Sequence, residues 1–374
     1  MKRLNLFLIL LALVQIAWAQ KKFTERLDSI VTDFEYACPS KYVFHYDVDG
    51  RLVEQLYYRK LEDGKWVNGD QRLYAYDEQG RVTFITTYSL EEKNVEPSRE
   101  RFEYDDKGRI SMWTSESYDK NRGEWYGFTS GGTRKYEYDA KGNRISNTYG
   151  GRSSSQDGTF RPMIRSEMEY DKKGRLIIQR DYRYDMNVLD GEKHLQHTDR
   201  YTYDKQGHVI SIVKDGLDSY YNGTEHYTYD KQGRLTSRVQ EGGISIPQKK
   251  EYYYDPHGNL IQIATFLLFD DCEWDHDWNE TFTYDQNTPV SSVMGLTCPE
   301  VLNTERYLRQ KLNLTSKPLN VYSDFGVAPG YHTSEEVVYY YSDIDTPPLE
   351  TNTHLSQQDS VKHSPIQPEK IVYK

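Results

Sequence analysis

A Tyr-Asp dipeptide recurs in register nine times through the middle of this 374-residue chain, and this repetition constrains the fold more than any other feature. Two further Tyr-Asp pairs, at Tyr118 and Tyr184, lack the glycine described below and are not counted. Successive aspartates lie 25 to 34 residues apart. In the first eight copies a glycine follows the aspartate by three residues, whereas the ninth copy, at Asp285, has Thr288 in that place. Self-similarity at a period of this length is typical of repeat proteins. The eight pairs are Asp47 and Gly50, Asp77 and Gly80, Asp105 and Gly108, Asp139 and Gly142, Asp171 and Gly174, Asp204 and Gly207, Asp230 and Gly233, and Asp255 and Gly258.

The spacing of these two residues predicts a tight turn. Aspartate at the first position of a type I turn can accept a hydrogen bond from a backbone N–H within the turn. Glycine at the fourth position readily takes the left-handed conformation that closes a three-residue hairpin loop with a bulge. Each Asp-x-x-Gly therefore predicts a β-hairpin, and the turn explains both residues without any appeal to function.

The residues that flank each turn predict strands. A large side chain stands two residues before each tyrosine, as at Phe44 and Tyr74, and a polar residue such as His45 separates the two. This period of two predicts a strand with one aromatic face and one polar face. After most of the glycines come an arginine and an aliphatic residue, which begin the return strand. The sequence predicts an all-β fold of tandem β-hairpin repeats, about 18 strands in all, which form one long, curved or spiralling antiparallel sheet. The twist of the sheet would coil it into a spiral, shell or barrel-like form.

The motif resembles that of a known family. Residues 227–235 read Tyr-Thr-Tyr-Asp-Lys-Gln-Gly-Arg-Leu, which is similar to the Rhs/YD-repeat proteins, and the resemblance covers roughly residues 42–293. It implies a large spiralling β-sheet on a bacterial surface or in a toxin-delivery shell, with carbohydrate binding in some members. The period here is longer than is usual in that family. The chain is also similar to looser Tyr-Asp repeat proteins that bacteria export by a type IX secretion route.

The chain divides into five predicted segments. Residues 1–19 resemble a signal peptide, with Lys2 and Arg3 before an apolar run and small residues at Ala17 and Ala19. We expect a lead-in at 20–41, nine hairpin repeats at 42–293, an irregular C-terminal cap with one or more strands at 294–345, and a linker or disordered tail at 346–374. The protein is therefore expected to be exported and to be secreted or associated with the cell surface or outer membrane.

The charge of the chain narrows the choice of partners. The formal net charge is −11, which disfavours nucleic acid as a partner because the two fields repel each other. We expect no transmembrane span after the signal peptide. Glycans or other proteins remain as expected ligands, and nothing in the sequence predicts a cofactor.

The three cysteines leave two interpretations open. A hairpin turn at Asp285 would bring Cys272 and Cys298 close together, so that they could form a disulfide in an oxidising compartment and leave Cys38 free. Alternatively, all three are unpaired thiols.

The candidate ligand-binding residues are Trp66, Trp125, Trp274 and Trp278, which lie between the Tyr-Asp turns. An exposed indole can stack on a sugar ring. The alternative, which we favour, is that these tryptophans pack as cross-strand partners.

An acidic run at residues 270–277 could supply oxygen ligands to a hard cation. Its spacing matches no calcium loop, so we interpret the run as a solvated edge and predict no metal site.

Common catalytic motifs are absent from the sequence, and we predict no catalytic residues. The favoured function is a non-catalytic secreted or cell-surface repeat protein that binds glycans or proteins through an extended β-sheet surface. One alternative is a purely structural component of the envelope or matrix. Another, less favoured, is a hydrolase of polysaccharides.

Overall fold

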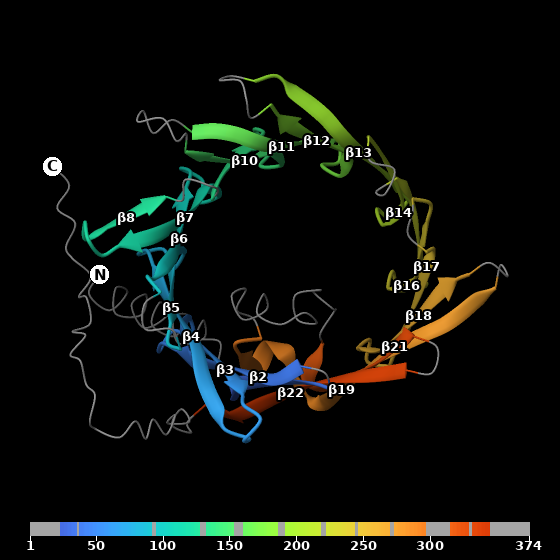
Figure 1. The fold of residues 1–374 in the computed structure, drawn as a ribbon. Coiled ribbons are helices and arrows are strands. Elements are labelled where there is room, and N and C mark those ends of the chain that lie inside the picture. The colour runs from blue at the N-terminus through green and yellow to red at the C-terminus, as the bar shows by residue number, and fades with distance from the viewer. Residues whose placement is uncertain are drawn as a thin grey trace, which may run out of the picture.

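The computed structural model describes residues 23–35, 37–91, 95–127, 132–152, 160–185, 191–217, 222–243, 246–269, 273–296, 315–328 and 331–344. These residues form 22 β-strands and one short 3₁₀ helix, η2 (Val290–Ser292). Figure 1 shows the strands arranged as a wide ring.

The strands follow one another along the chain with short connections. They are β1 (Glu25–Phe34), β2 (Ala37–Tyr46), β3 (Leu52–Lys60), β4 (Trp66–Tyr76), β5 (Val82–Ser89), β6 (Ser98–Tyr104), β7 (Ile110–Asp119), β8 (Glu124–Gly127), β9 (Thr133–Tyr138), β10 (Arg144–Arg152), β11 (Phe160–Tyr170), β12 (Leu176–Tyr184), β13 (Lys193–Tyr203), β14 (Val209–Gly216), β15 (Gly223–Tyr229), β16 (Leu235–Glu241), β17 (Gln248–Tyr254), β18 (Leu260–Leu268), β19 (Trp274–Pro289), β20 (Val293–Met294), β21 (Ser316–Ala328) and β22 (Tyr331–Asp343).

The sheet closes on itself as a barrel. Neighbouring strands pair antiparallel around the ring, except that β8 is an extra strand on β7 and β7 continues the ring through β9. After β19 the ring runs through β21 and β22, and β22 pairs with β1. The two-residue strand β20 pairs parallel with β1 outside this sequence of neighbours.

The all-β, antiparallel fold was predicted correctly, but the expected long, curved or spiralling sheet does not end in free edges and instead closes into a barrel. An open sheet leaves two edges whose backbone N–H and C=O groups lack partners, and closure removes both edges. The first and last described strands pair along nine positions, from Glu25 with Asp343 to Phe34 with Glu335. We call this junction the seam.

Eight Tyr-Asp motifs close hairpins of the same geometry. In the first, the Gly50 N–H donates to the Asp47 carbonyl, and the Asp47 N–H donates to the Arg51 carbonyl. The eight glycines have φ between +76° and +101°, a conformation that a side chain would strain. Each turn is followed by a bulge, as between His45 and Tyr46 in the pairing of β2 with β3.

The ninth motif differs from the other eight. Asp285 lies within β19, which runs on to Pro289, so no hairpin closes at this motif. The Asp285 carboxylate instead accepts a hydrogen bond from the Thr288 hydroxyl at 2.8 Å and lies 3.2 Å from Lys317 Nζ at the start of β21. The prediction of a ninth hairpin here is therefore wrong, because Thr288 stands where a glycine would be needed.

The Tyr-Asp tyrosines of the eight hairpins lie on one face of the sheet, which we call the tyrosine face. Residues 290–296 pack on this face at the seam, and Figure 1 shows this part of the chain inside the ring. Because paired residues of adjacent strands point to the same side, the tyrosine face is the inner face of the barrel. Its buried core gathers at the seam and consists of Leu27, Ile30, Phe44, Leu52, Tyr74, Leu260, Ile263, Phe282, Val293, Leu296, Val321, Val337 and Tyr339.

Candidate functional site

The tyrosine hydroxyls join each hairpin to the one before it. Tyr76 donates to the Leu52 carbonyl at 2.7 Å, and Tyr203 donates to the Leu176 carbonyl at 2.6 Å. In both cases the acceptor is the first residue of the preceding return strand. The same bond is formed by Tyr104, Tyr138, Tyr170, Tyr229, Tyr254 and Tyr284, each with the equivalent carbonyl one hairpin back.

The turn aspartate and the arginine after the glycine form a second link between hairpins. Asp105 Oδ2 accepts a hydrogen bond from Arg109 Nε at 2.7 Å, and this interaction holds the pKa of the Asp105 carboxyl below its usual range. The Arg109 guanidinium lies 4.2 Å from the centre of the Tyr138 ring of the next hairpin. The turns therefore lie side by side along one rim of the barrel, which we call the turn rim.

An ionic network centred on the buried Glu225 lies on the inner face, on the strands β14 to β16 that precede the apolar core. Glu225 on β15 is only 4% exposed. Its carboxylate accepts hydrogen bonds from Lys214 at 2.6 Å, from Arg238 at 2.9 and 3.1 Å, and from the Tyr227 hydroxyl. Burial acts to raise the pKa of Glu225, but these donors prevail and lower it to about 2.

A second group of polar residues stands next to this network on β12 and β13. His197 Nε2 lies 3.1 Å from Asp181 and 3.8 Å from Asp199. Burial raises the pKa of Asp199, and it raises the pKa of the neighbouring Tyr201 to about 12. From β12 to β16 the inner face thus combines half-buried tyrosines with fixed carboxylates and cations. Such a surface can bind a polar ligand by hydrogen bonds and by contact with aromatic rings.

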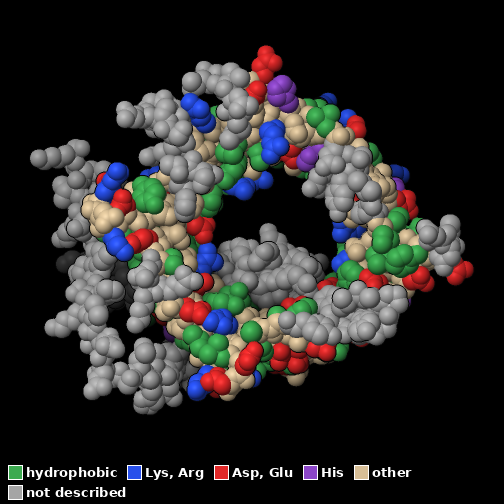
Figure 2. Space-filling view, viewed as in Figure 1, with side chains coloured by type: hydrophobic (Ala, Val, Ile, Leu, Met, Phe, Trp, Pro, Cys, Tyr) green, Lys and Arg blue, Asp and Glu red, His purple; other side chains and the backbone are tan. Residues whose placement is uncertain are grey.

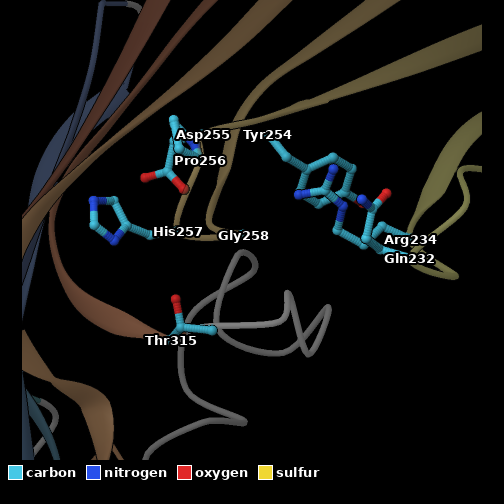
Figure 3. Close-up of a pocket in the computed structure, with 8 residues that line it drawn as sticks. All are labelled: Gln232, Arg234, Tyr254, Asp255, Pro256, His257, Gly258 and Thr315. Atoms are coloured by element: carbon cyan, nitrogen blue, oxygen red, sulfur yellow. The ribbon is translucent and has the colours of Figure 1, made fainter.

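A cavity of about 850 Å³ opens on the turn rim between the seventh and eighth turns. Figure 3 shows the Arg234 side chain beside the Tyr254 ring on one wall and His257 on another. Arg234 is already bound to Asp230 at 2.6 Å. Gln232, Asp255, Pro256, Gly258 and Thr315 complete the lining.

The four candidate tryptophans are not brought together. Trp66 begins β4 and is 38% exposed, whereas Trp125 lies on β8 with the Arg99 guanidinium 4.3 Å from its ring and Tyr118 at 5.3 Å. Trp274 and Trp278 lie on β19 beside Lys249 and Lys250, with cation-to-ring distances of 5.6 and 5.4 Å. They form no single stacking platform.

The remaining candidate sites fall partly outside the described residues. Cys272 and Cys298 are not among the described residues, so the disulfide between them stays a prediction. Cys38 is an exposed free thiol on β2. Part of the acidic run, residues 270–272, is also outside. Within the described ranges, no group of three or more His, Cys, Asp or Glu side chains is placed to hold a metal ion. No helix in the same ranges is long and apolar enough to cross a membrane.

No family model matches the sequence, and no curated protein matches it. Solved structures show weak similarity. The chain TcdB2-TccC3-TEV matches at 13% identity and a TM-score of 0.31, over 84% of this chain and 20% of that chain. A Tc holotoxin pore of Photorhabdus luminescens matches at 11% identity and a TM-score of 0.29, over 81% of this chain and 16% of that one. A porin-like protein from Bacteroides uniformis matches at 11% identity and a TM-score of 0.30, over 68% of this chain and 96% of that one.

The inner ionic network was missed by reasoning from the sequence. Its members, Lys214, Glu225 and Arg238, lie on three successive strands and share no motif. The alternation of the strands could nevertheless have pointed to these residues, because all three lie on the same face of the sheet as the tyrosines. A charged residue in such a position needs a partner across the strand.

Proposed function

We propose that this chain is an exported, non-catalytic binding protein whose barrel presents its inner face to a glycan or protein ligand. One observation carries the proposal: from β12 to β16 the inner face is a polar and aromatic surface whose charged groups hold each other in place. Preorganised side chains lose little conformational freedom when a ligand binds. The resemblance of the Tyr-Asp motif to surface and shell proteins with carbohydrate-binding members supports the same class of function.

The proposal can be tested with two matched substitutions. Ile164 on β11 and Leu195 on β13 are both 43% exposed, but Ile164 lies on the inner face and Leu195 on the outer face. A glycan array would be probed with a chain that lacks residues 1–19, and with its Ile164→Glu and Leu195→Glu variants. We expect saturable binding that Ile164→Glu weakens and Leu195→Glu leaves unchanged.

Two other results would favour the alternatives. No binding to any glycan, together with no protein captured by the intact chain and released by Ile164→Glu, would favour a purely structural role. Conversion of any glycan on the array to shorter products would favour a hydrolase and overturn the non-catalytic proposal.

A further inference from the structure

From the third turn to the seventh, each turn on the turn rim exposes at least one lysine, and in the last four of these turns no acidic residue shares the exposed positions. Each Asp-x-x-Gly turn exposes its two middle residues. In the fourth to seventh turns these pairs are Ala140 and Lys141, Lys172 and Lys173, Lys205 and Gln206, and Lys231 and Gln232, all of them exposed. We call Lys141, Lys172, Lys173, Lys205 and Lys231 the lysine arc.

The lysine arc is free to meet a partner. None of its five amino groups takes part in an ion pair with another residue that the structure describes, and no acidic residue shares the exposed positions of these four turns. The aspartate carboxylates of these turns bind other groups and not the lysines. Asp171 binds the backbone and side chain of Arg175, and Asp204 binds the backbone N–H and ring of His208.

The four turns form one continuous row. The Arg175 guanidinium lies 4.6 Å from the Tyr203 ring of the following hairpin, and the His208 ring stacks on Tyr229 at 4.6 Å. Each hairpin contributes two strands, so successive turns are roughly 10 Å apart. The lysine arc thus presents a regular row of positive charges on a protein whose net charge is −11.

We infer that the lysine arc binds an acidic polysaccharide, a linear chain with one carboxylate on every second sugar. A linear chain can follow the row and place a carboxylate near each turn. This inference rests on the proposed function only in treating the chain as a non-catalytic binding protein. It concerns the turn rim and not the inner face.

The rest of the rim argues against a flat anionic partner. The first three turns expose Asp49, Glu78 and Asp106 at the same positions, with Lys107 beside Asp106 as their one lysine, so an anionic membrane laid across the rim would meet these carboxylates. Single-stranded nucleic acid is usually held by aromatic side chains on which the bases stack. The exposed positions of the eight turns carry no Phe, Tyr or Trp.

The test uses hyaluronan oligosaccharides, which carry one carboxylate per disaccharide, and the chain without residues 1–19. In the arc variant Lys172, Lys173, Lys205 and Lys231 are each replaced by Gln. A control variant has Gln at Lys60, Lys65, Lys120 and Lys193, which lie at strand ends and turns on the opposite rim and change the net charge equally. Circular dichroism would establish that both variants are folded.

We expect hyaluronan binding that weakens with added salt, falls about tenfold or more in the arc variant and changes little in the control. No measurable binding, or an equal loss in both variants, would overturn the inference. Equal or tighter binding of single-stranded DNA or of vesicles that contain phosphatidylserine would also overturn it, because the surface would then not be selective for a polysaccharide. The Ile164→Glu variant keeps the two proposals separate: it should bind hyaluronan normally even if the inner face proves to bind nothing.

Discussion

At the scale of single residues, the aspartate, the glycine and the tyrosine of the repeat motif each have a different structural role. The aspartate accepts hydrogen bonds from two backbone N–H groups of its turn, as Asp47 does from Asp49 and Arg51 at 3.0 and 2.9 Å. The glycine supplies the left-handed conformation. The tyrosine hydroxyl reaches the preceding hairpin, so one motif specifies both a turn and a contact between repeats.

We predict that Tyr203→Phe lowers the free energy of unfolding by about 1 kcal/mol, because the Leu176 carbonyl loses its hydroxyl donor. Urea unfolding would measure the change. Tyr340→Phe is the matched control, since Tyr340 is 48% exposed on the outer side of the seam. Equal effects of the two substitutions would show that the hydrogen bonds from the tyrosine hydroxyls to the preceding hairpins contribute nothing specific to stability.

A second prediction concerns Gly207, which has φ of +101° and open space around the position of an added Cβ. Gly207→Ala should cost about 1 to 2 kcal/mol of unfolding free energy, because only backbone strain opposes it. Gly207→Asn should cost less, since asparagine tolerates the left-handed conformation better. If alanine were as well tolerated as asparagine in urea unfolding, the turn geometry would be wrong.

The turn residues show what a sequence can and cannot predict at this scale. Asp47 and Gly50 act within five residues of each other, so their spacing predicts the turn. The acceptor of the Tyr76 hydroxyl lies 24 residues away, and its identity depends on how the hairpins stack. Alternation places Tyr76 on the aromatic face but says nothing about where its hydroxyl points.

At the scale of the elements, paired strands position charged side chains that are far apart in sequence. Lys214, Glu225 and Arg238 lie on β14, β15 and β16, and the pairing of these strands brings them together. The prediction of strands was sound here because each hairpin repeats a local pattern. The network could not be predicted with the same assurance, because it depends on the register between neighbouring hairpins.

This network predicts a pH dependence whose sign follows from the pKa of Glu225, which falls from 4.5 to about 2 on folding. A carboxyl with a lowered pKa stabilises the fold above its unfolded value, and this stabilisation is lost as the pH falls from 4.5 toward 2. At pH 7, Glu225→Gln should be less stable than the parent chain by about 2 kcal/mol.

Urea unfolding of both chains at a series of pH values checks this prediction. The difference between them should shrink steadily below about pH 4.5, since protonated glutamate and glutamine are alike in shape and charge. A difference that stays constant down to about pH 3 would mean that Glu225 is not stabilised as a carboxylate in the folded protein.

At the scale of the whole molecule, the decisive event is the pairing of β1 with β22. Local signals do not predict it, because the same hairpins would fit an open spiral equally well. Closure needs the first and last strands to meet in register and needs residues 290–296 to fill the core at the seam. Lys317 supports the seam by binding Glu25 at 2.6 Å.

A closed ring also arranges surface charge in a way that a linear sequence hides. The four turns that carry the lysine arc are about 30 residues apart in the chain, yet the pairing of neighbouring hairpins sets them side by side on one rim. Figure 2 shows Lys and Arg side chains along parts of the inner edge of the ring as well. A net negative charge therefore does not describe each surface of this protein.

Closure can be tested most directly by disulfide cross-linking across the seam. Asp33 on β1 and Glu336 on β22 are exposed and directly opposite each other, so cysteines there would have Cβ atoms about 5 Å apart. The test chain would carry Asp33→Cys and Glu336→Cys, with Cys38→Ser to remove the exposed native thiol. Asp33→Cys with Thr202→Cys on β13 would serve as the distant control.

Mass spectrometry after mild oxidation should find a disulfide between positions 33 and 336 in high yield and none between positions 33 and 202 in the control. Absence of the disulfide between positions 33 and 336 in a folded protein would contradict the closed barrel and favour an open sheet.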